Sequence, residues 1–284
     1  MMYCLAIVLF VSLRRSYGAV GFGYQWAYEG NNGPSSWYYD FPLCGEYRQS
    51  PVSIRTNEAV MNSDWLAPIK IRGYESPEKL QMYLINNGHT VQINLQGAPI
   101  SITGGGLNDV YVAQQIHFHW GKTNYRGSEH NIDGRYFPME MHIVHYNTRY
   151  NNFVNALDKE GGLAVLAFLF EIGEHNSHLD QIINRIPEPA EYVQMKTFDL
   201  RELLPESLDG FCHYYGSLTT PPCYESVNWF IFYETIEISR RQLNAFRHSV
   251  HPNVGNEPIR YFSEHFRPPQ PLNGRKIYCR NKDW

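Results

Sequence analysis

Two histidines lie two residues apart in the stretch QQIHFHWG, residues 114–121, among large apolar side chains. Side chains two apart in a β-strand point to the same face, so His117 and His119 would share a face with Gln115. Burying an imidazole costs free energy unless its ring nitrogens are hydrogen-bonded or bind a metal. The pair therefore suggests metal binding, although two hydrogen-bonded structural histidines would give the same short pattern.

A second stretch, MEMHIVHY at residues 139–146, places Glu140 and His142 on one face of another strand. Three imidazoles would converge if these two strands paired in a suitable register. Gln115 and Glu140 each lie two residues from a histidine, where each can accept its second N–H and fix its orientation. Three histidines without a protein carboxylate suit Zn²⁺, with the fourth tetrahedral position left to water. The pattern predicts a catalytic zinc site.

Strands must position these side chains, and alternating or continuous runs of apolar residues predict them. The runs are KLQMYLI (79–85), TVQINL (90–95), VYVAQQIHFHW (110–120), MEMHIVHY (139–146), LAVLAFLF (163–170) and NWFIFYE (228–234).

Helical signals are fewer. A capping box of Ser177 and Asp180 predicts a helix that ends before Pro187, and Ser239 with Gln242 predicts another. A short third helix is expected at residues 199–204. Many strands with few helices indicate an α+β, mainly β fold dominated by one large sheet.

Length and composition fit one large domain of about 250 residues or two small ones. The chain has 284 residues, of which 43% are hydrophobic and 18% charged, and its net charge is −4. No linker-like or repeated segment interrupts it, which favours one domain of about 250 residues. The mildly acidic balance argues against nucleic acid as a partner.

The N-terminus predicts export. The apolar run Tyr3–Leu13 has the length of a signal-peptide core, and small residues at 18–21 suit cleavage. We expect a signal peptide at 1–18, with its boundary uncertain over 18–21, followed by a domain at 22–284. A buried first strand or helix is the alternative. The polar C-terminus predicts no membrane anchor.

Three motifs together resemble the α-class carbonic anhydrases: IHFHWG, EMHIVHYN and YGSLTTPP (215–222). The resemblance continues, in order, through residues 25–275. The further matching segments are NNGPSSW, RQSPV, NNGH, GSEHNID, GLAVLAF, LLPESLD and FRPPQPLNGR.

This resemblance implies a single domain around a large, mostly antiparallel twisted sheet with a few short peripheral helices. It also implies one Zn²⁺ per chain and reversible hydration of CO₂ to bicarbonate and a proton. Zinc-bound hydroxide would be the nucleophile, because the metal lowers the pKa of its bound water to about 7, the value known for this family.

The resemblance assigns roles around the metal. His117, His119 and His142 match the zinc ligands, and Glu129 and Thr219 match the pair that orients the nucleophile. An ionised carboxylate can only accept a hydrogen bond, so the Thr219 hydroxyl would donate to Glu129 and accept from the hydroxide. Thr220 and the main-chain N–H of Thr219 would contact bicarbonate.

His89 matches the family's proton shuttle. Passing a proton from an acid of pKa about 7 directly to water is uphill by roughly 10 kcal/mol, whereas transfer to an imidazole is nearly level. Tyr28, Asn87 and Gln92 match the positions that order the connecting waters. An exposed histidine without a role is the alternative for His89.

The remaining matches concern substrate and stability. The hydrophobic wall for CO₂ matches Val144, Val165, Leu218, Val227 and Trp229. Cys44 and Cys223 match the bridge of exported members, whereas Cys212 and Cys279 either form a second bridge or stay free. His130 and His145 are expected to be hydrogen-bonded structural histidines. His265 stands where relatives have an Asn whose carbonyl supports a ligand histidine.

The sequence thus predicts a secreted, extracellular carbonic anhydrase of unknown oligomeric state that sulfonamides and anions inhibit. A catalytically silent binding or matrix protein is the main alternative. Silent relatives typically lack one or more zinc histidines, and this chain keeps all three. A zinc hydrolase acting on esters or peptides is a further alternative, although no H-E-x-x-H helix is present.

Overall fold

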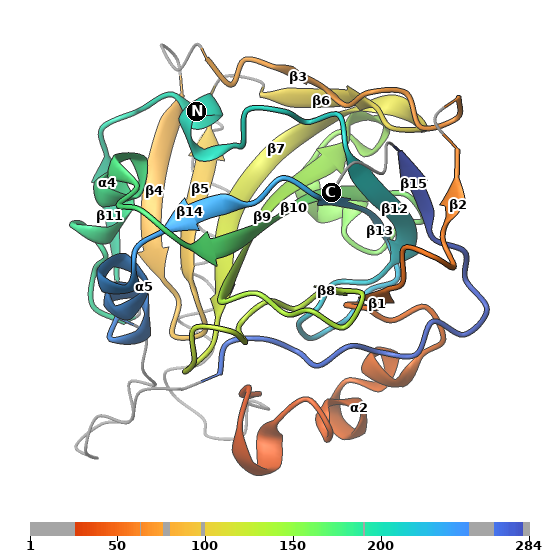
Figure 1. Cartoon of the computed structure of the whole chain (residues 1–284), viewed down its shortest axis with the longest axis horizontal. Coiled ribbons are helices and arrows are strands. Elements are labelled where there is room, and N and C mark those ends of the chain that lie inside the picture. The colour runs from red at the N-terminus through yellow and green to blue at the C-terminus, as the bar shows by residue number, and fades with distance from the viewer. Residues whose placement is uncertain are drawn as a thin grey trace.

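The structure, a computed structural model, describes residues 26–62, 64–75, 80–97, 100–189, 191–249 and 264–280. The expected signal peptide lies outside these residues. A large twisted sheet dominates the fold, with short helices at its margins (Figure 1). This confirms the predicted mainly β domain with few helices.

The strands are β1 (Ser53–Ile54), β2 (Val60–Met61), β3 (Lys70–Arg72), β4 (Gln81–Asn86), β5 (Val91–Gln96), β6 (Ser101–Gly104), β7 (Leu107–Trp120), β8 (Asn131–Ile132), β9 (Met139–Asn147), β10 (Leu163–Ile172), β11 (Tyr192–Met195), β12 (Phe211–Gly216), β13 (Val227–Phe232), β14 (Ile236–Ile238) and β15 (Tyr278–Arg280). The α-helices are α2 (Trp37–Asp40), α3 (Phe153–Ala156), α4 (Asp180–Ile183) and α5 (Arg240–Arg247). The 3₁₀-helices are η1 (Gly30–Asn32), η2 (Pro42–Gly45), η4 (Thr148–Tyr150), η5 (Ser177–Leu179) and η6 (Leu200–Leu203).

The main sheet runs in the order β11-β4-β5-β7-β9-β10-β13-β12-β15-β2. Its pairs are antiparallel except β10–β13 and β15–β2, and β14 also lies parallel to β10. Core side chains cover both faces of the central strands, so β9 and β10 are buried almost throughout. Continuous apolar runs are typical of strands covered on both faces, which explains the sequence of β10.

The three predicted helices lie where their sequence signals indicated, with one corrected cap, whereas α2, α3, η1, η2 and η4 were not predicted. Ser239 and Gln242 form the predicted capping box at the start of α5. The predicted cap Ser177 is wrong, because the Asn176 side chain accepts from the His178 N–H and Ser177 already belongs to η5. Both residue types cap helices well, so local sequence does not separate them. The expected helix at 199–204 is the short η6.

The register of β7 against β9 decides where the histidines lie. His117 is directly opposite His142, and His119 is opposite Glu140. On the other side of β7, Gln92 of β5 is opposite His117. A shift of one residue would turn one strand's side chains to the other face, so this register is required for convergence.

Two disulfides connect distant segments. Cys44 is bonded to Cys223, as the resemblance implied, and Cys212 is bonded to Cys279. The second bridge joins residues directly opposite each other on β12 and β15, with a Cα–Cα distance of 4.1 Å. It resolves the question that the sequence left open.

Among the described residues, no helix is long and apolar enough to cross a membrane.

Candidate metal centre

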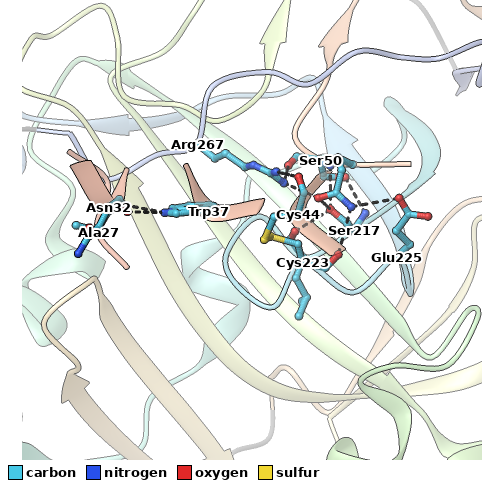
Figure 2. Close-up of a disulfide and its surroundings, with 11 residues drawn as sticks. Ala27, Asn32, Trp37, Cys44, Ser50, Ser217, Cys223, Glu225 and Arg267 are labelled. Atoms are coloured by element: carbon cyan, nitrogen blue, oxygen red, sulfur yellow. Dashed lines mark hydrogen bonds between the residues drawn. A yellow bond between two sulfur atoms is a disulfide. The ribbon is translucent and has the colours of Figure 1, made fainter. Parts of the chain in front are cut away.

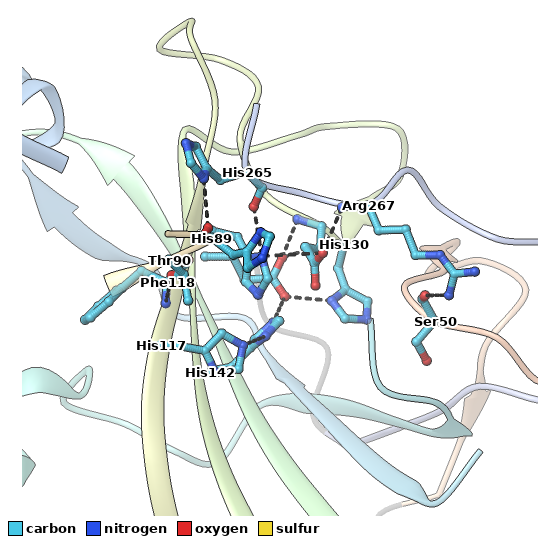
Figure 3. Close-up of polar contacts among 12 residues, drawn as sticks. Ser50, His89, Thr90, His117, Phe118, His130, His142, His265 and Arg267 are labelled. Carbon is cyan, nitrogen blue, oxygen red and sulfur yellow. Dashed lines mark hydrogen bonds and ion pairs between the residues drawn. The ribbon is translucent and has the colours of Figure 1, made fainter. Parts of the chain in front are cut away.

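Three imidazoles meet at the middle of the sheet. Strand β7 supplies His117 and His119, and β9 supplies His142. One ring nitrogen from each lies within 4.8 Å of the others, and His117 Nε2 is 3.2 Å from His142 Nδ1 (Figure 3). His119 and His142 are buried and His117 is partly buried. The predicted convergence is therefore present.

In each imidazole, the nitrogen that points away from the other two rings contacts an oxygen atom, which can only accept a hydrogen bond. His117 Nδ1 is 2.8 Å from Gln115 Oε1, and His142 Nε2 is 2.7 Å from Glu140 Oε1. His119 Nδ1 donates to the main-chain carbonyl of His265 at 2.9 Å. These contacts place the N–H of each ring on its outer side, so the facing nitrogens carry lone pairs.

The three histidines are neutral. Burial, followed by the neighbouring imidazoles, holds the pKa of His117 and His119 well below the usual value. Burial also lowers the pKa of His142, against the opposing effect of Glu140. Neutral imidazole is the form that binds a metal.

The residues present fit a zinc ion. His119 Nε2 is buried and has no hydrogen-bond partner among the described residues. Such an orphaned atom is costly without a ligand, and three nitrogen donors with no carboxylate suit Zn²⁺. A second close group, His130, Glu140 and His142, is instead a hydrogen-bonded cluster, because both imidazoles lie 2.7 Å from Glu140 Oε1.

Glu140 connects the triad to the next segment of chain. Its Oε1 lies 2.7 Å from nitrogens of both His130 and His142, and its Oε2 accepts from the N–H groups of Glu129 and His130 at 2.8 Å. Burial alone would raise the pKa of Glu140, but the two histidines hold it well below its usual value. The role predicted from spacing was to orient His142; the structure adds anchoring of the 129–130 backbone.

Glu129 is buried beside the triad. Its Oε1 accepts from the Arg267 N–H at 2.9 Å and lies 3.4 Å from His119 Nδ1. Its Oε2 has no hydrogen bond of good geometry in the described structure, although the Thr219 hydroxyl is close enough to help lower its pKa. Burial and the charge of Glu140 outweigh this and raise the pKa well above the usual value. A bound divalent cation would act in the opposite direction.

The segment that carries Thr219 and Thr220 is held at both ends. The Trp229 indole donates to the Ser217 carbonyl at 3.0 Å, and the Cys223 N–H donates to the Thr220 carbonyl at 2.9 Å. The Cys44–Cys223 disulfide then ties this segment to the N-terminal part of the chain (Figure 2).

Arg267 reinforces the same junction. Its guanidinium donates to the carbonyls of Ser50 and Cys44 and to the Gln49 side chain, while its main-chain N–H holds Glu129. The disulfide region and the carboxylate beside the triad therefore share one anchoring residue.

Three residues of the expected hydrophobic wall form one row of the sheet next to the triad. Val144 of β9 is opposite Val165 of β10, which is opposite Trp229 of β13. The Trp229 ring lies 4.8 Å from that of His142, measured between centroids. Val227 is buried in the same apolar cluster, and Leu218 packs against it. The structure thus brings all five expected residues together.

His89 lies on the turn between β4 and β5. Its ring is stacked on Trp26, with centroids 3.8 Å apart, and its Nδ1 is buried without a hydrogen bond to any described residue. Burial, then His265, lowers the pKa of His89 to about 4. In this position the imidazole is neutral and a weak base.

The three residues expected along the proton path differ in setting. Tyr28 is buried, with its ring 6.5 Å from that of His119. Gln92 of β5 is opposite His117 of β7, and its side chain donates to Asn94 Oδ1 at 2.6 Å. The exposed Asn87 uses its side-chain oxygen to accept from the N–H groups of His89 and Thr90, so it shapes the turn.

One contact that the sequence interpretation missed links the triad to the turn that carries His89. That interpretation treated His265 as a main-chain support only, whereas its Nδ1 also donates to the His89 carbonyl at 2.9 Å (Figure 3). The substitution of Asn by His was the available signal. The remaining structural histidines behave as expected: His145 contacts Tyr74 and the Ala164 carbonyl.

Comparison with known proteins agrees with the site. Residues 32–281 match the family model of the eukaryotic-type carbonic anhydrases, a zinc-dependent family. Over 262 residues the chain is 38% identical to mouse Carbonic anhydrase 6, in an alignment that spans 89% of this chain and 80% of that protein. The chain therefore belongs to the eukaryotic-type carbonic anhydrase family and is a carbonic anhydrase, a lyase acting on carbon dioxide and bicarbonate.

Proposed function

We propose that this chain binds one Zn²⁺ through His117, His119 and His142 and uses it to hydrate CO₂ reversibly. One observation carries the proposal: three lone-pair nitrogens face one another, and one of them, His119 Nε2, is buried without a hydrogen-bond partner in the part of the chain that the structure describes. When bound, the metal would lower the pKa of a water to about 7, the value known for this family, and so supply hydroxide at neutral pH.

Glu129 and Thr219 would orient this nucleophile. Glu129 Oε1 accepts from the Arg267 N–H, and its Oε2, which has no hydrogen bond to a described residue, would accept from the nearby Thr219 hydroxyl. With that proton committed, the Thr219 oxygen can only accept from the nucleophile, which turns a lone pair toward the substrate. Thr220 and the Thr219 N–H would then contact the bicarbonate product.

CO₂ would sit against the row of apolar side chains beside the triad. Val144, Val165 and Trp229 are nearly fully buried and carry no group that competes with hydroxide for the carbon. An apolar wall suits a substrate without a net dipole, and excluding water there protects the reacting atoms. Leu218 and Val227 would complete the wall.

His89 would carry the proton away. Burial is the main cause of its low pKa, so moving the ring from the Trp26 stack into water would return that pKa toward its usual value. An imidazole of pKa near 6.5 would then accept a proton with almost no free-energy cost. Tyr28, Asn87 and Gln92 would order the waters between His89 and the metal centre.

We also propose that the protein is secreted. Two disulfides are typical of an oxidising compartment, and the apolar N-terminal run is typical of a signal peptide. Sulfonamides and small anions are expected inhibitors, because an anion can take the position of the nucleophile at the metal.

The proposal is tested by measuring zinc content and CO₂ hydration for the wild type and for His142→Ala. The variant should lose bound zinc and all hydration above background, since one of three ligands is gone. His175→Ala is the matched control, because His175 is exposed and paired with Asp180, and it should retain both zinc and activity. Full zinc occupancy together with hydration in His142→Ala would show that the ligand assignment is wrong.

A further inference from the structure

His265 makes three contacts that converge on the candidate site. Its N–H donates to the Trp120 carbonyl and its carbonyl accepts from His119 Nδ1, both at 2.9 Å. Its side chain, through Nδ1, donates to the main-chain carbonyl of His89 at 2.9 Å. The same residue therefore touches a proposed metal ligand with its backbone. Its ring touches the segment of His89 (Figure 3).

The ring of His265 is held in place. The residue is fully buried, and its ring packs on Trp120 at 4.4 Å and near Tyr28 at 5.9 Å between centroids. A carbonyl can only accept a hydrogen bond, so the proton of this contact resides on His265 Nδ1. A different rotamer would leave the His89 carbonyl without this donor.

The turn that carries His89 is otherwise fixed mainly by local contacts. Asn87 Oδ1 accepts from the N–H groups of His89 and Thr90. Beyond the turn, the Thr90 hydroxyl donates to the carbonyl of Phe118, which lies between two metal ligands on β7. The His265 ring therefore adds a side-chain contact that links the His89 main chain to the residue supporting His119.

We propose that His265 is a positioning residue for proton transfer. Its Nδ1–H sets the distance and direction of His89 from the metal centre, while its carbonyl sets the orientation of His119. This inference rests on the proposed function, in which His89 is the shuttle. Proton transfer is sensitive to donor–acceptor geometry, so loosening the turn should slow proton export while leaving the attack on CO₂ intact.

The test uses His265→Phe, His265→Asn and His89→Ala in the full chain. Phe keeps the ring but has no donor, whereas the Asn Nδ2 occupies the same place along the side chain as the His Nδ1 and can donate. In weak buffer, His265→Phe should lower kcat at least about threefold. This loss is smaller than the roughly 10²–10⁴-fold rate contribution of acid–base catalysis, because His89 itself is still present. Its kcat/KM and zinc content should stay within about twofold of wild type. Added imidazole and the Asn variant should both restore kcat.

A readout independent of activity accompanies the kinetics. In the metal-free protein, backbone amides at residues 87–90 should exchange hydrogen faster in His265→Phe than in wild type or His265→Asn, while those of β12 and β13 stay unchanged. A general loss of stability would instead accelerate exchange in all of these segments.

The failures are distinguishable. If His89→Ala slows turnover in weak buffer but His265→Phe does not, the inference is wrong and the proposed shuttle stands. If His265→Phe loses zinc or lowers kcat/KM as much as kcat, the residue acts through His119 and the inference is also wrong. If His89→Ala turns over like wild type, the shuttle and this inference both fail.

Discussion

Replacing Glu140 with Gln should weaken metal binding although no ligand is changed. The carboxylate contacts four donors: the ring nitrogens of His130 and His142 at one oxygen, and the N–H groups of Glu129 and His130 at the other. Gln has only one acceptor oxygen, and its NH₂ group must face one of the two donor pairs. At least two hydrogen bonds are therefore lost, and two donors are left buried.

The magnitude follows from that count. A buried donor without an acceptor costs about 1–3 kcal/mol, so the two together cost roughly 2–6 kcal/mol of folding free energy. Loss of such an outer partner of a metal ligand typically costs 10–100-fold in affinity, or about 1.4–2.8 kcal/mol. We expect Glu140→Gln to weaken zinc binding within that range, because the His142 ring loses the acceptor that fixes its tautomer.

Zinc affinity is measured by competition with a chelator, and the stability of the metal-free protein by urea unfolding. Glu234→Gln is the matched control, since that carboxylate accepts from the N–H groups of Glu206 and Ser207 on an exposed loop. The control should change zinc affinity by less than about twofold, the scatter expected away from the site. Zinc affinity of Glu140→Gln equal to that of the control would refute the orienting role.

Other predictions concern stability and the substrate pocket. Replacing Cys212 and Cys279 with Ser should lower the free energy of unfolding by up to about 4 kcal/mol, because the unfolded chain would no longer be constrained by a bridge between residues 67 positions apart. An unchanged urea midpoint of unfolding would contradict this. Burial lowers the pKa of His145 and His213 to about 4. Because their unfolded pKa is higher, near 6.5, the unfolded state binds more protons, and stability should fall as pH drops from 6.5 toward 4, by about 2 kcal/mol for each at pH 5; urea titrations of metal-free protein that show no loss between pH 7 and 5 would refute it. In Val144→Phe, the larger ring should occupy the space proposed for CO₂ beside the apolar wall and lower kcat/KM by at least about tenfold, with normal zinc content. Full activity in stopped-flow assays would place the substrate elsewhere.

The sequence was most informative where the relevant physics is local. Alternating side chains placed His117 and His119 on one face, and the pairing of Ser239 with Gln242 marked the start of α5. These features depend on neighbours within a few residues. The cap at Asn176 was missed because two adjacent residues could each have served.

Several strands were also missed, among them the six-residue β12 and the three-residue β15. β15 has only three residues, and it forms by pairing with β12 and β2. Length and alternation carry little signal in so short a segment, so the pairing of Cys212 with Cys279 could not be inferred before the strands were placed beside each other.

By itself, the sequence determined which residues could bind a metal, which face of each strand they share, and which family the chain resembles. Tertiary structure alone decided that His117 lies opposite His142, which nitrogen of each ring faces inward, and that His265 contacts both His119 and His89, 146 and 176 positions away. The physical reason is that side-chain periodicity is a property of the local backbone. Register and long-range hydrogen bonds instead follow from burial and pairing summed over the whole sheet.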